Sequence, residues 1–435
     1  MTRPARPRGL RRVGAGIADQ LLYSASNFAL TIVVARSTTV DGFGLFALLL
    51  TTDLVLVAVA RGLTSETLVV RYSAADPPTW RRAAESAGGL ALLFGLVSGL
   101  VLAVVALAVG DGFRTAGLAL AVVLPGLLVQ DFLRYAAIAA KRPGAALVND
   151  AVQIVCQFAV IGVIVAADRV STPLLVLAWG GSAYLGALMG AVVLKVVPRV
   201  PQAGDWWRRE HAMASRYALD DLGSAVGPNA AVYVVAAVAG LSGPAALRGA
   251  ATVFAPPSIL NLGVQVAVVP ELVRTLQTSV AAMARRALLV GAAMAVVGAV
   301  WGGLALLAPD SLGRFLFGDT WDLARGLIGW YLVNQVAAGL RQTPVLGLRA
   351  LGAANRSLIS RCLQLGIALV AQVTGAVLGG AEGVAVGLAV GGPVIVVACW
   401  WQYRLALGEY AENVSPTARR AREEPAASTP DPAEE

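Results

Sequence analysis

The sequence predicts an all-α polytopic membrane protein, with twelve transmembrane helices arranged as two bundles of six. Composition, the recurrence of long apolar segments and the distribution of positive charge predict this class. Of the 435 residues, 57% are hydrophobic and only 14% are charged, and the mean hydropathy is +0.71. Soluble domains are about half apolar and about a quarter charged. A chain this apolar could not cover its surface with polar groups in water, so we expect it to lie in a membrane.

Apolar segments long enough to cross a bilayer recur along the whole chain. A spanning helix needs about 20 predominantly apolar residues. The second and eighth segments are the least uniform. The expected spans are 13–34, 43–63, 86–109, 116–139, 147–167, 173–194, 217–239, 246–270, 286–308, 324–347, 356–378 and 383–405.

Positive charge is distributed unequally between the two sides of this topology. With an even number of spans both termini share a side, and the positive-inside rule places that side in the cytoplasm. The net charge of +8 therefore indicates basic cytoplasmic loops, and we expect no nucleic-acid partner. Only six of the 34 Lys and Arg residues fall on the opposite side: Arg36, Arg114, Arg169, Arg248, Arg314 and Arg325.

Several function classes are excluded by what the sequence lacks. The three cysteines lie in apolar segments and His211 is the only histidine, so we expect no metal site and no cofactor. The sequence contains no G-x-x-x-x-G-K-[ST] motif for ATP hydrolysis. The expected external loops are short and leave no room for a catalytic domain. We therefore expect that the chain is not an enzyme.

The two halves of the sequence resemble each other. A shift of 202 residues places Asp19 on Asp221 and Asn27 on Asn229, in the first and seventh spans. Because six is even, a six-plus-six repeat relates the halves by an axis along the membrane normal. We expect a basic cytoplasmic N-terminus at 1–12, an N-lobe at 13–195, a cytoplasmic linker at 196–216, a C-lobe at 217–405 and a disordered cytoplasmic tail at 406–435.

Polar side chains form a ridge on the first span. Asp19, Tyr23 and Asn27 are spaced by four residues and share one helical face, and Asp221 and Asn229 repeat the pattern in the seventh span. An Asp in the middle of a membrane costs roughly 2.5–3.5 kcal/mol on insertion scales. The ridges should therefore face a cavity or the protein interior. They either bind substrate or a coupling ion, or hold neighbouring helices together by hydrogen bonds.

Three arginines within or near spans are candidate anion-binding residues. Arg61 ends the second span, and Arg134 in the fourth follows Asp131 by one turn, so a local Asp131–Arg134 salt bridge is the alternative to a binding role. Arg341 and Gln342 in the tenth span have no acid nearby in the same helix. A guanidinium group suits phosphate in particular.

Two acid–base pairs follow the second and eighth spans. Glu66 with Arg71, and Glu271 with Arg274, are candidate pairs for a cytoplasmic gate. The alternative is ordinary surface ion pairs, each worth at most about 1 kcal/mol.

The beginning of the chain resembles a known family. Residues 1–50 resemble the opening of the polysaccharide-transporter (Wzx-like) flippases, which belong to the multidrug/oligosaccharidyl-lipid/polysaccharide (MOP) exporter superfamily. The resemblance implies a MATE/MOP-like fold with a central cavity between two lobes, and alternating access driven by an ion gradient. The residues that carry it are Asp19-Gln20, Ser24, Ser26-Asn27-Phe28, Ala35-Arg36 and Gly42-Phe43-Gly44-Leu45-Phe46-Ala47.

Three functional hypotheses follow from these observations. The first is a flippase in a bacterial inner membrane that translocates lipid-linked glycans of the undecaprenyl-diphosphate type, alongside glycan assembly enzymes. Its arginines would hold the diphosphate, and its buried acids would bind sugar or couple to H⁺ or Na⁺. The second is a drug exporter of the same superfamily, which would need an acidic and aromatic cavity. The third is a membrane-embedded polymerase or glycosyltransferase, which would need a large external loop.

Overall fold

The structure is a computed structural model that describes residues 8–414, with side chains from Leu22 onward except at positions 228, 262 and 266. Every regular element in this part of the chain is helical. The first half contains α1 (Arg8–Ser37), α2 (Val40–Ala60), the π-helical turn η1 (Arg61–Ser65), α3 (Glu66–Tyr72), α4 (Pro77–Val109), α5 (Asp111–Ala139), α6 (Pro143–Ala166), α7 (Thr172–Leu194) and the 3₁₀ turn η2 (Val200–Gln202). The second half contains α8 (Ala203–Ala239), α9 (Ser242–Val253), α10 (Ala255–Leu276), α11 (Val280–Leu307), α12 (Asp310–Phe317), α13 (Thr320–Ala350) and α14 (Ala354–Val414).

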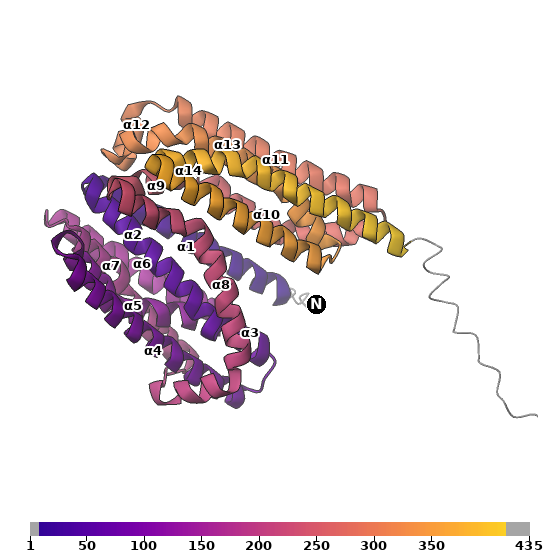
Figure 1. Cartoon of the computed structure of the whole chain (residues 1–435). Coiled ribbons are helices and arrows are strands. Elements are labelled where there is room, and N and C mark those ends of the chain that lie inside the picture. Colours follow the sequence, from indigo (N-terminus) through magenta and orange to yellow (C-terminus); the bar gives the residue numbers. More distant parts are fainter. Residues whose placement is uncertain (1–7, 415–435) are drawn as a thin grey trace, which may run out of the picture.

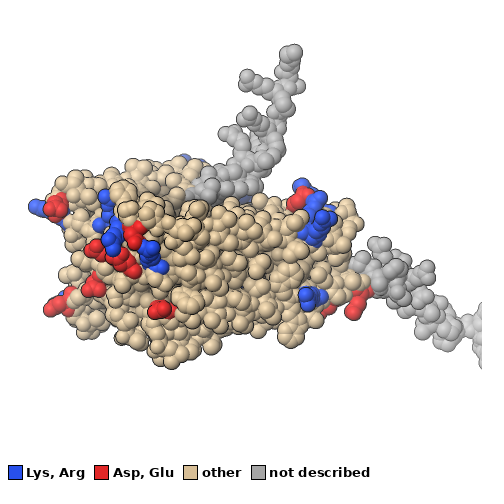
Figure 2. Space-filling model, turned by 90° about the horizontal axis from the view of Figure 1, so that it is seen from above, with Lys and Arg blue, Asp and Glu red and all other residues tan. Residues whose placement is uncertain are grey.

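The helices form two bundles, one from each half of the chain (Figure 1). Each of the twelve expected spans falls on helical structure, and the expected all-α membrane fold is confirmed. The second span continues through η1 into α3, and the eighth is divided between α9 and α10. By length and apolar composition, eight described helices could cross a membrane, or nine if the bent α8 counts as one span. Charged side chains in Figure 2 gather toward the two ends and leave a mostly uncharged waist.

Helix α14 contains both of the last two expected spans. Its backbone leaves the helical region at Gly379 and Gly380, where Gly380 has a φ of 55° that favours glycine. The two halves then pack backbone to backbone, because a Cβ added at Gly375 would lie 2.1 Å from the carbonyl oxygen of Gly383. The helix continues to Val414. The expectation of a disordered tail from residue 406 is therefore wrong for residues 406–414.

Helix α8 connects the two lobes and includes most of the expected linker. It begins at Ala203 rather than near residue 217, because the stripe that contains Trp206 and Glu210 is buried against the N-lobe. Trp206 donates a hydrogen bond from Nε1 to the carbonyl oxygen of Leu63 in η1, at 3.0 Å. The helix bends by 46° between Gly227 and Asn229. Its first part therefore follows the N-lobe, and its last part packs with α9 and α14 in the C-lobe.

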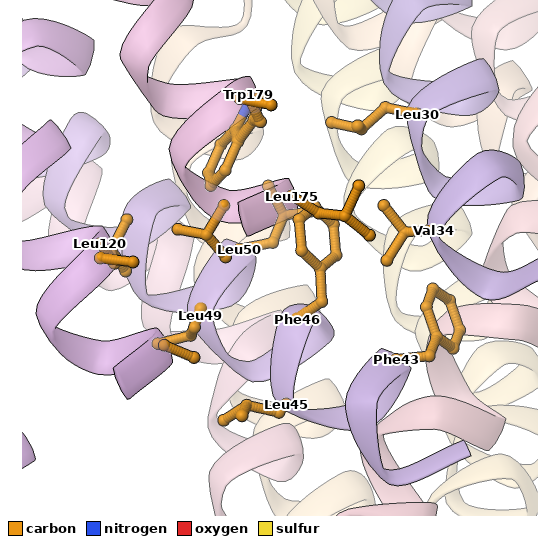
Figure 3. Close-up of a cluster of buried hydrophobic side chains, with 14 of the residues drawn as sticks. Leu30, Val34, Phe43, Leu45, Phe46, Leu49, Leu50, Leu120, Leu175 and Trp179 are labelled. Atoms are coloured by element: carbon orange, nitrogen blue, oxygen red, sulfur yellow. The ribbon is translucent and has the colours of Figure 1, made fainter. Parts of the chain in front are cut away.

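The largest hydrophobic cluster is centred in the N-lobe on α1, α2, α5 and α7 (Figure 3). Phe46 of α2 contacts Trp179 of α7 edge to face, with ring centroids 5.8 Å apart. The cluster also includes C-lobe residues such as Phe254 and Trp321. The two lobes therefore share a continuous apolar core near α12.

The lobes are joined tightly at this same end. A Cβ added at Gly44 of α2 would lie 1.8 Å from the carbonyl oxygen of Leu241, in the turn between α8 and α9. The Arg36 guanidinium at the end of α1 stacks over the Phe315 ring of α12, 4.4 Å from its centroid. The bundles diverge toward the opposite end, where α1 begins (Figure 1).

Candidate functional site

Two cavities lie between the lobes and share the side chain of Arg248. The first, here called the α1–α9 cavity, has a volume of about 390 Å³ and is bounded by α1, α9 and the start of α10. Tyr23, Asn27 and Thr31 line it from one face of α1. Its other lining residues are Ser24, Phe28, Arg248, Ala251, Thr252, Ala255, Ser258 and Ile259. None of the described lining residues is a carboxylate.

The second cavity lies on the other side of Arg248. This α2–α8 cavity has a volume of about 130 Å³ and includes Thr51 of α2, Asn229 of α8, Tyr331 of α13 and Gln372 of α14. Asn229 donates a hydrogen bond from Nδ2 to the carbonyl oxygen of Ala225, at 2.7 Å, which leaves its side-chain oxygen available to a ligand. No acid lines this cavity among the described residues.

Arg248 is a half-buried cation without a carboxylate partner in the described part of the chain. It contacts Thr31 of the N-lobe, with 3.4 Å between Nη2 and Oγ1, and its Nε is buried without a hydrogen-bond acceptor. The topology derived from the sequence counted Arg248 among the external charges. In the structure α9 begins at Ser242 and carries Arg248 between the lobes. A buried and unpaired guanidinium is costly unless an anion binds it.

A third cavity lies inside the N-lobe and has the opposite electrostatic character. It holds about 30 Å³, enough for about one water molecule or small ion. Three carboxylates line it, from Asp53 of α2, Asp131 of α5 and Asp150 of α6. The neutral polar residues around it are Tyr23, Ser26, Asn27, Gln130, Gln153 and Gln157.

Two of these carboxylates are neutralised by arginines from other helices. Arg61 binds Asp131 through two hydrogen bonds, from Nε to Oδ2 at 2.8 Å and from Nη2 to Oδ1 at 2.6 Å. Arg134 pairs with Asp150, with 3.0 Å between Nε and Oδ2. Gln130 donates a further hydrogen bond to Asp150 at 2.9 Å. The alternative of a local Asp131–Arg134 bridge within α5 is not formed, because each side chain pairs with a residue outside α5.

Asp53 is the carboxylate of this cavity that forms no ion pair with the described residues. Its side chain is 6% exposed, and its Oδ1 has no hydrogen-bond partner among the described residues. Gln157, 2% exposed, likewise has an unsatisfied Nε2. No group of three His, Cys, Asp or Glu side chains that could hold a metal ion occurs among the described residues.

Tyr23 and Asn27 connect this N-lobe cavity to the α1–α9 cavity, because both residues line both. The Arg134 guanidinium stacks over the Tyr23 ring, 4.7 Å from its centroid. One face of α1 thus separates an anionic chamber from a cationic one.

Of the two expected gate pairs, Glu271–Arg274 forms and Glu66–Arg71 does not. Arg71 pairs with Glu210 of α8 at 3.2 Å, and not with Glu66, because α8 packs beside α3. Glu271 pairs with Arg274 at 3.8 Å, but it also pairs with Arg286 of α11 at 2.6 Å. All three residues of the second group are at least half exposed on their side chains, as in ordinary surface ion pairs.

The other predicted site residues lie apart from these cavities or outside the described side chains. Asp19 lies on α1, but its side chain is outside the described part. Asp221 of α8 is half-buried and has a buried Oδ2 without a hydrogen bond. Arg341 is half-buried in α13 and lines none of the three cavities, and the adjacent Gln342 is buried with an unsatisfied Oε1.

Sequence reasoning missed Asp53, Asp150 and Arg248. For Asp53 the signal was present, because it is a carboxylate in the middle of the apolar segment 43–63. Asp150 could be found in the same way near the start of the span 147–167. The position of Arg248 between the lobes could not be predicted in this way, because it depends on the residue at which α9 begins.

Comparison with solved structures identifies the fold. The chain matches a structure described as the inward-facing conformation of a multidrug resistance MATE family transporter of the MOP superfamily, with a TM-score of 0.65 at 14% identity, over 91% of this chain and 96% of the other. It matches the lipid II flippase MurJ, in an inward closed conformation, with a TM-score of 0.70 at 10% identity, over 91% and 90% of the two chains. The chain has the MOP-superfamily fold.

The MOP fold is recognised through structure alone. An outward-facing MATE family transporter also matches, with a TM-score of 0.60 at 16% identity, over 92% of this chain and 95% of the other. No protein-family model and no curated protein sequence matches the chain. All three structures named here are of transporters or flippases.

Proposed function

We propose that this protein is a flippase that moves a lipid-linked oligosaccharide across a bacterial inner membrane by alternating access, with both termini in the cytoplasm. The observation that carries the proposal is the unpaired Arg248 in an interlobe cavity that has no carboxylate in its described lining. The diphosphate of an undecaprenyl-diphosphate-type carrier supplies the anion that this guanidinium lacks. Thr31, Asn27 and Asn229 provide hydrogen-bonding groups for sugar hydroxyls.

The N-lobe cavity supports coupling to an ion gradient. Asp53 is desolvated, has no cationic partner within the described part of the chain and faces a space of the size of one ion, so it can take up either H⁺ or Na⁺. Tyr23 and Asn27 are shared with the substrate-facing cavity. Occupation of Asp53 can therefore alter the face of α1 that contacts the substrate.

The role of Arg248 can be tested in proteoliposomes. The probe is a fluorescent polyprenyl-diphosphate-linked sugar, whose movement between leaflets is followed with a membrane-impermeant quencher. We expect Arg248→Gln to reduce translocation at least tenfold, because one charge-assisted contact to phosphate is worth about 1.5–3 kcal/mol. Arg248→Lys should retain part of the activity. The control is Arg169→Gln, which removes an exposed arginine far from the cavities.

Normal translocation by Arg248→Gln at equal protein levels would remove this residue from the mechanism. Efflux of a cationic dye that depends on the protein, without any movement of the diphosphate lipid, would favour the drug-exporter hypothesis. The absence of carboxylates from the described linings of both interlobe cavities argues against that hypothesis. A polymerase would instead alter polymer length in a deletion strain while single repeat units still reached the surface.

A further inference from the structure

The second half of α14 presents an apolar stripe that ends in a cation. Val390, Val394, Val397 and Trp401 are spaced by three or four residues, so they share one helical face, and all four are exposed. Arg404 continues the same face and is also exposed. We call these five residues the α14 track.

A groove runs along the C-terminal part of the α14 track. It has a volume of about 390 Å³ and is lined by Val396, Val397, Trp400, Trp401 and Arg404. The exposed valine side chains are apolar and therefore contact the hydrocarbon region of a bilayer. Tryptophan is enriched at the level of the lipid headgroups. The groove thus passes from the hydrocarbon region to the interface, with Arg404 at its polar end.

Arg404 forms no hydrogen bond or ion pair with the described residues, whereas two potential acceptors close to it in α14 are occupied. Arg356 binds Glu409 through Nε at 3.0 Å and Gln402 through Nη1 at 3.3 Å. Arg361, the other arginine early in α14, hydrogen-bonds Ser224 at 2.6 Å. The guanidinium of Arg404 is therefore free to bind phosphate, to which it can donate two parallel hydrogen bonds.

We propose that the α14 track binds one anionic phospholipid, with an acyl chain along the valines, its glycerol region against Trp401 and its phosphate at Arg404. An anionic lipid is favoured over a zwitterionic one because it leaves the positive charge of Arg404 balanced. This site is on the outer surface of the C-lobe and is independent of the transported substrate.

Tryptophan quenching by brominated lipids tests the proposal on the full chain. The protein is placed in bilayers that contain phosphatidylglycerol or phosphatidylcholine, each brominated in the upper part of the acyl chain. The contribution of Trp401 is the quenching lost in Trp401→Phe. We expect phosphatidylglycerol to bind there about fivefold more tightly, as one basic residue near a membrane surface contributes on the order of 1 kcal/mol.

Two arginine variants distinguish a specific lipid site at Arg404 from a general attraction between the basic protein and anionic lipids. Arg404→Gln should abolish the preference, while Arg285→Gln, which removes an exposed arginine from α11, should preserve it. Raising the salt concentration should weaken the preference in the wild-type chain. Equal binding of both lipids, a preference that survives Arg404→Gln, or no quenching of Trp401 by either lipid would each overturn the proposal.

Discussion

Arg134 and Asp150 illustrate how individual side chains stabilise the N-lobe. Both are almost fully buried, with side-chain exposures of 7% and 1%, and their ion pair joins α5 to α6. Removal of one partner of a buried ion pair leaves the other charge unpaired in a low-dielectric environment and is destabilising. Replacement of both partners by apolar residues can leave the stability nearly unchanged.

We therefore expect Arg134→Met to destabilise the protein by about 3 kcal/mol, and the double variant Arg134→Met with Asp150→Leu to recover most of this loss. Thermal unfolding in detergent, followed by intrinsic fluorescence, measures both. An equal or larger loss in the double variant would show that the pair is not the main source of the effect.

Asp53 allows a residue-scale test of coupling. Asp53→Asn keeps the shape of the side chain but removes its charge, so transport should lose its dependence on an imposed H⁺ or Na⁺ gradient. Asp111→Asn, at a fully exposed position, serves as the control. Transport by the two variants under each gradient in turn would also distinguish the two ions. Unchanged stimulation in Asp53→Asn would place the coupling site elsewhere.

Among the elements, η1 and α8 are in close contact. A Cβ added at Gly62 would lie 2.3 Å from the backbone nitrogen of Ala218, so the π-helical turn approaches α8 backbone to backbone. The neighbouring Arg61 holds Asp131 on the other side of the turn. This short segment therefore links the N-lobe cavity to the helix that enters the C-lobe.

Gly62→Ala should lower the free energy of unfolding by about 1–3 kcal/mol, the usual cost of overpacking. Gly112→Ala, where an added Cβ meets nothing within 4 Å, is the matched control and should be close to neutral. Comparable unfolding temperatures for the two variants would contradict the tight contact.

Over the whole molecule, the sequence predicted the helices better than their mutual contacts. The spans could be located because hydropathy is a local property of about 20 consecutive residues. The partners of Asp131 and Arg71 could not, because they depend on how neighbouring helices are rotated and placed. The position of Arg248 depended on a boundary, and boundaries are the least reliable part of such predictions.

If the proposed alternating access occurs by rigid-body movement of the lobes, a cross-link between them will stop transport. Tyr233 of α8 hydrogen-bonds Thr52 of α2 at 3.1 Å across the lobe seam. In a background without Cys156, Cys362 and Cys399, a short bismaleimide across cysteines at positions 52 and 233 should reduce transport at least tenfold. Cross-linking positions 122 and 184, which are in contact within the N-lobe, should have little effect. Full transport in the first cross-linked variant would argue against rocking of the lobes.

The pairing of Arg61 with Asp131 also has a consequence for biosynthesis. The two residues are 70 positions apart, so α2 leaves the ribosome well before α5 has been made. Until then the Arg61 charge can reach the water interface from its position at the end of α2. The Arg61–Asp131 contact can therefore form only after the fourth span has entered the bilayer, and truncated chains that end before α5 should be targets for membrane proteases.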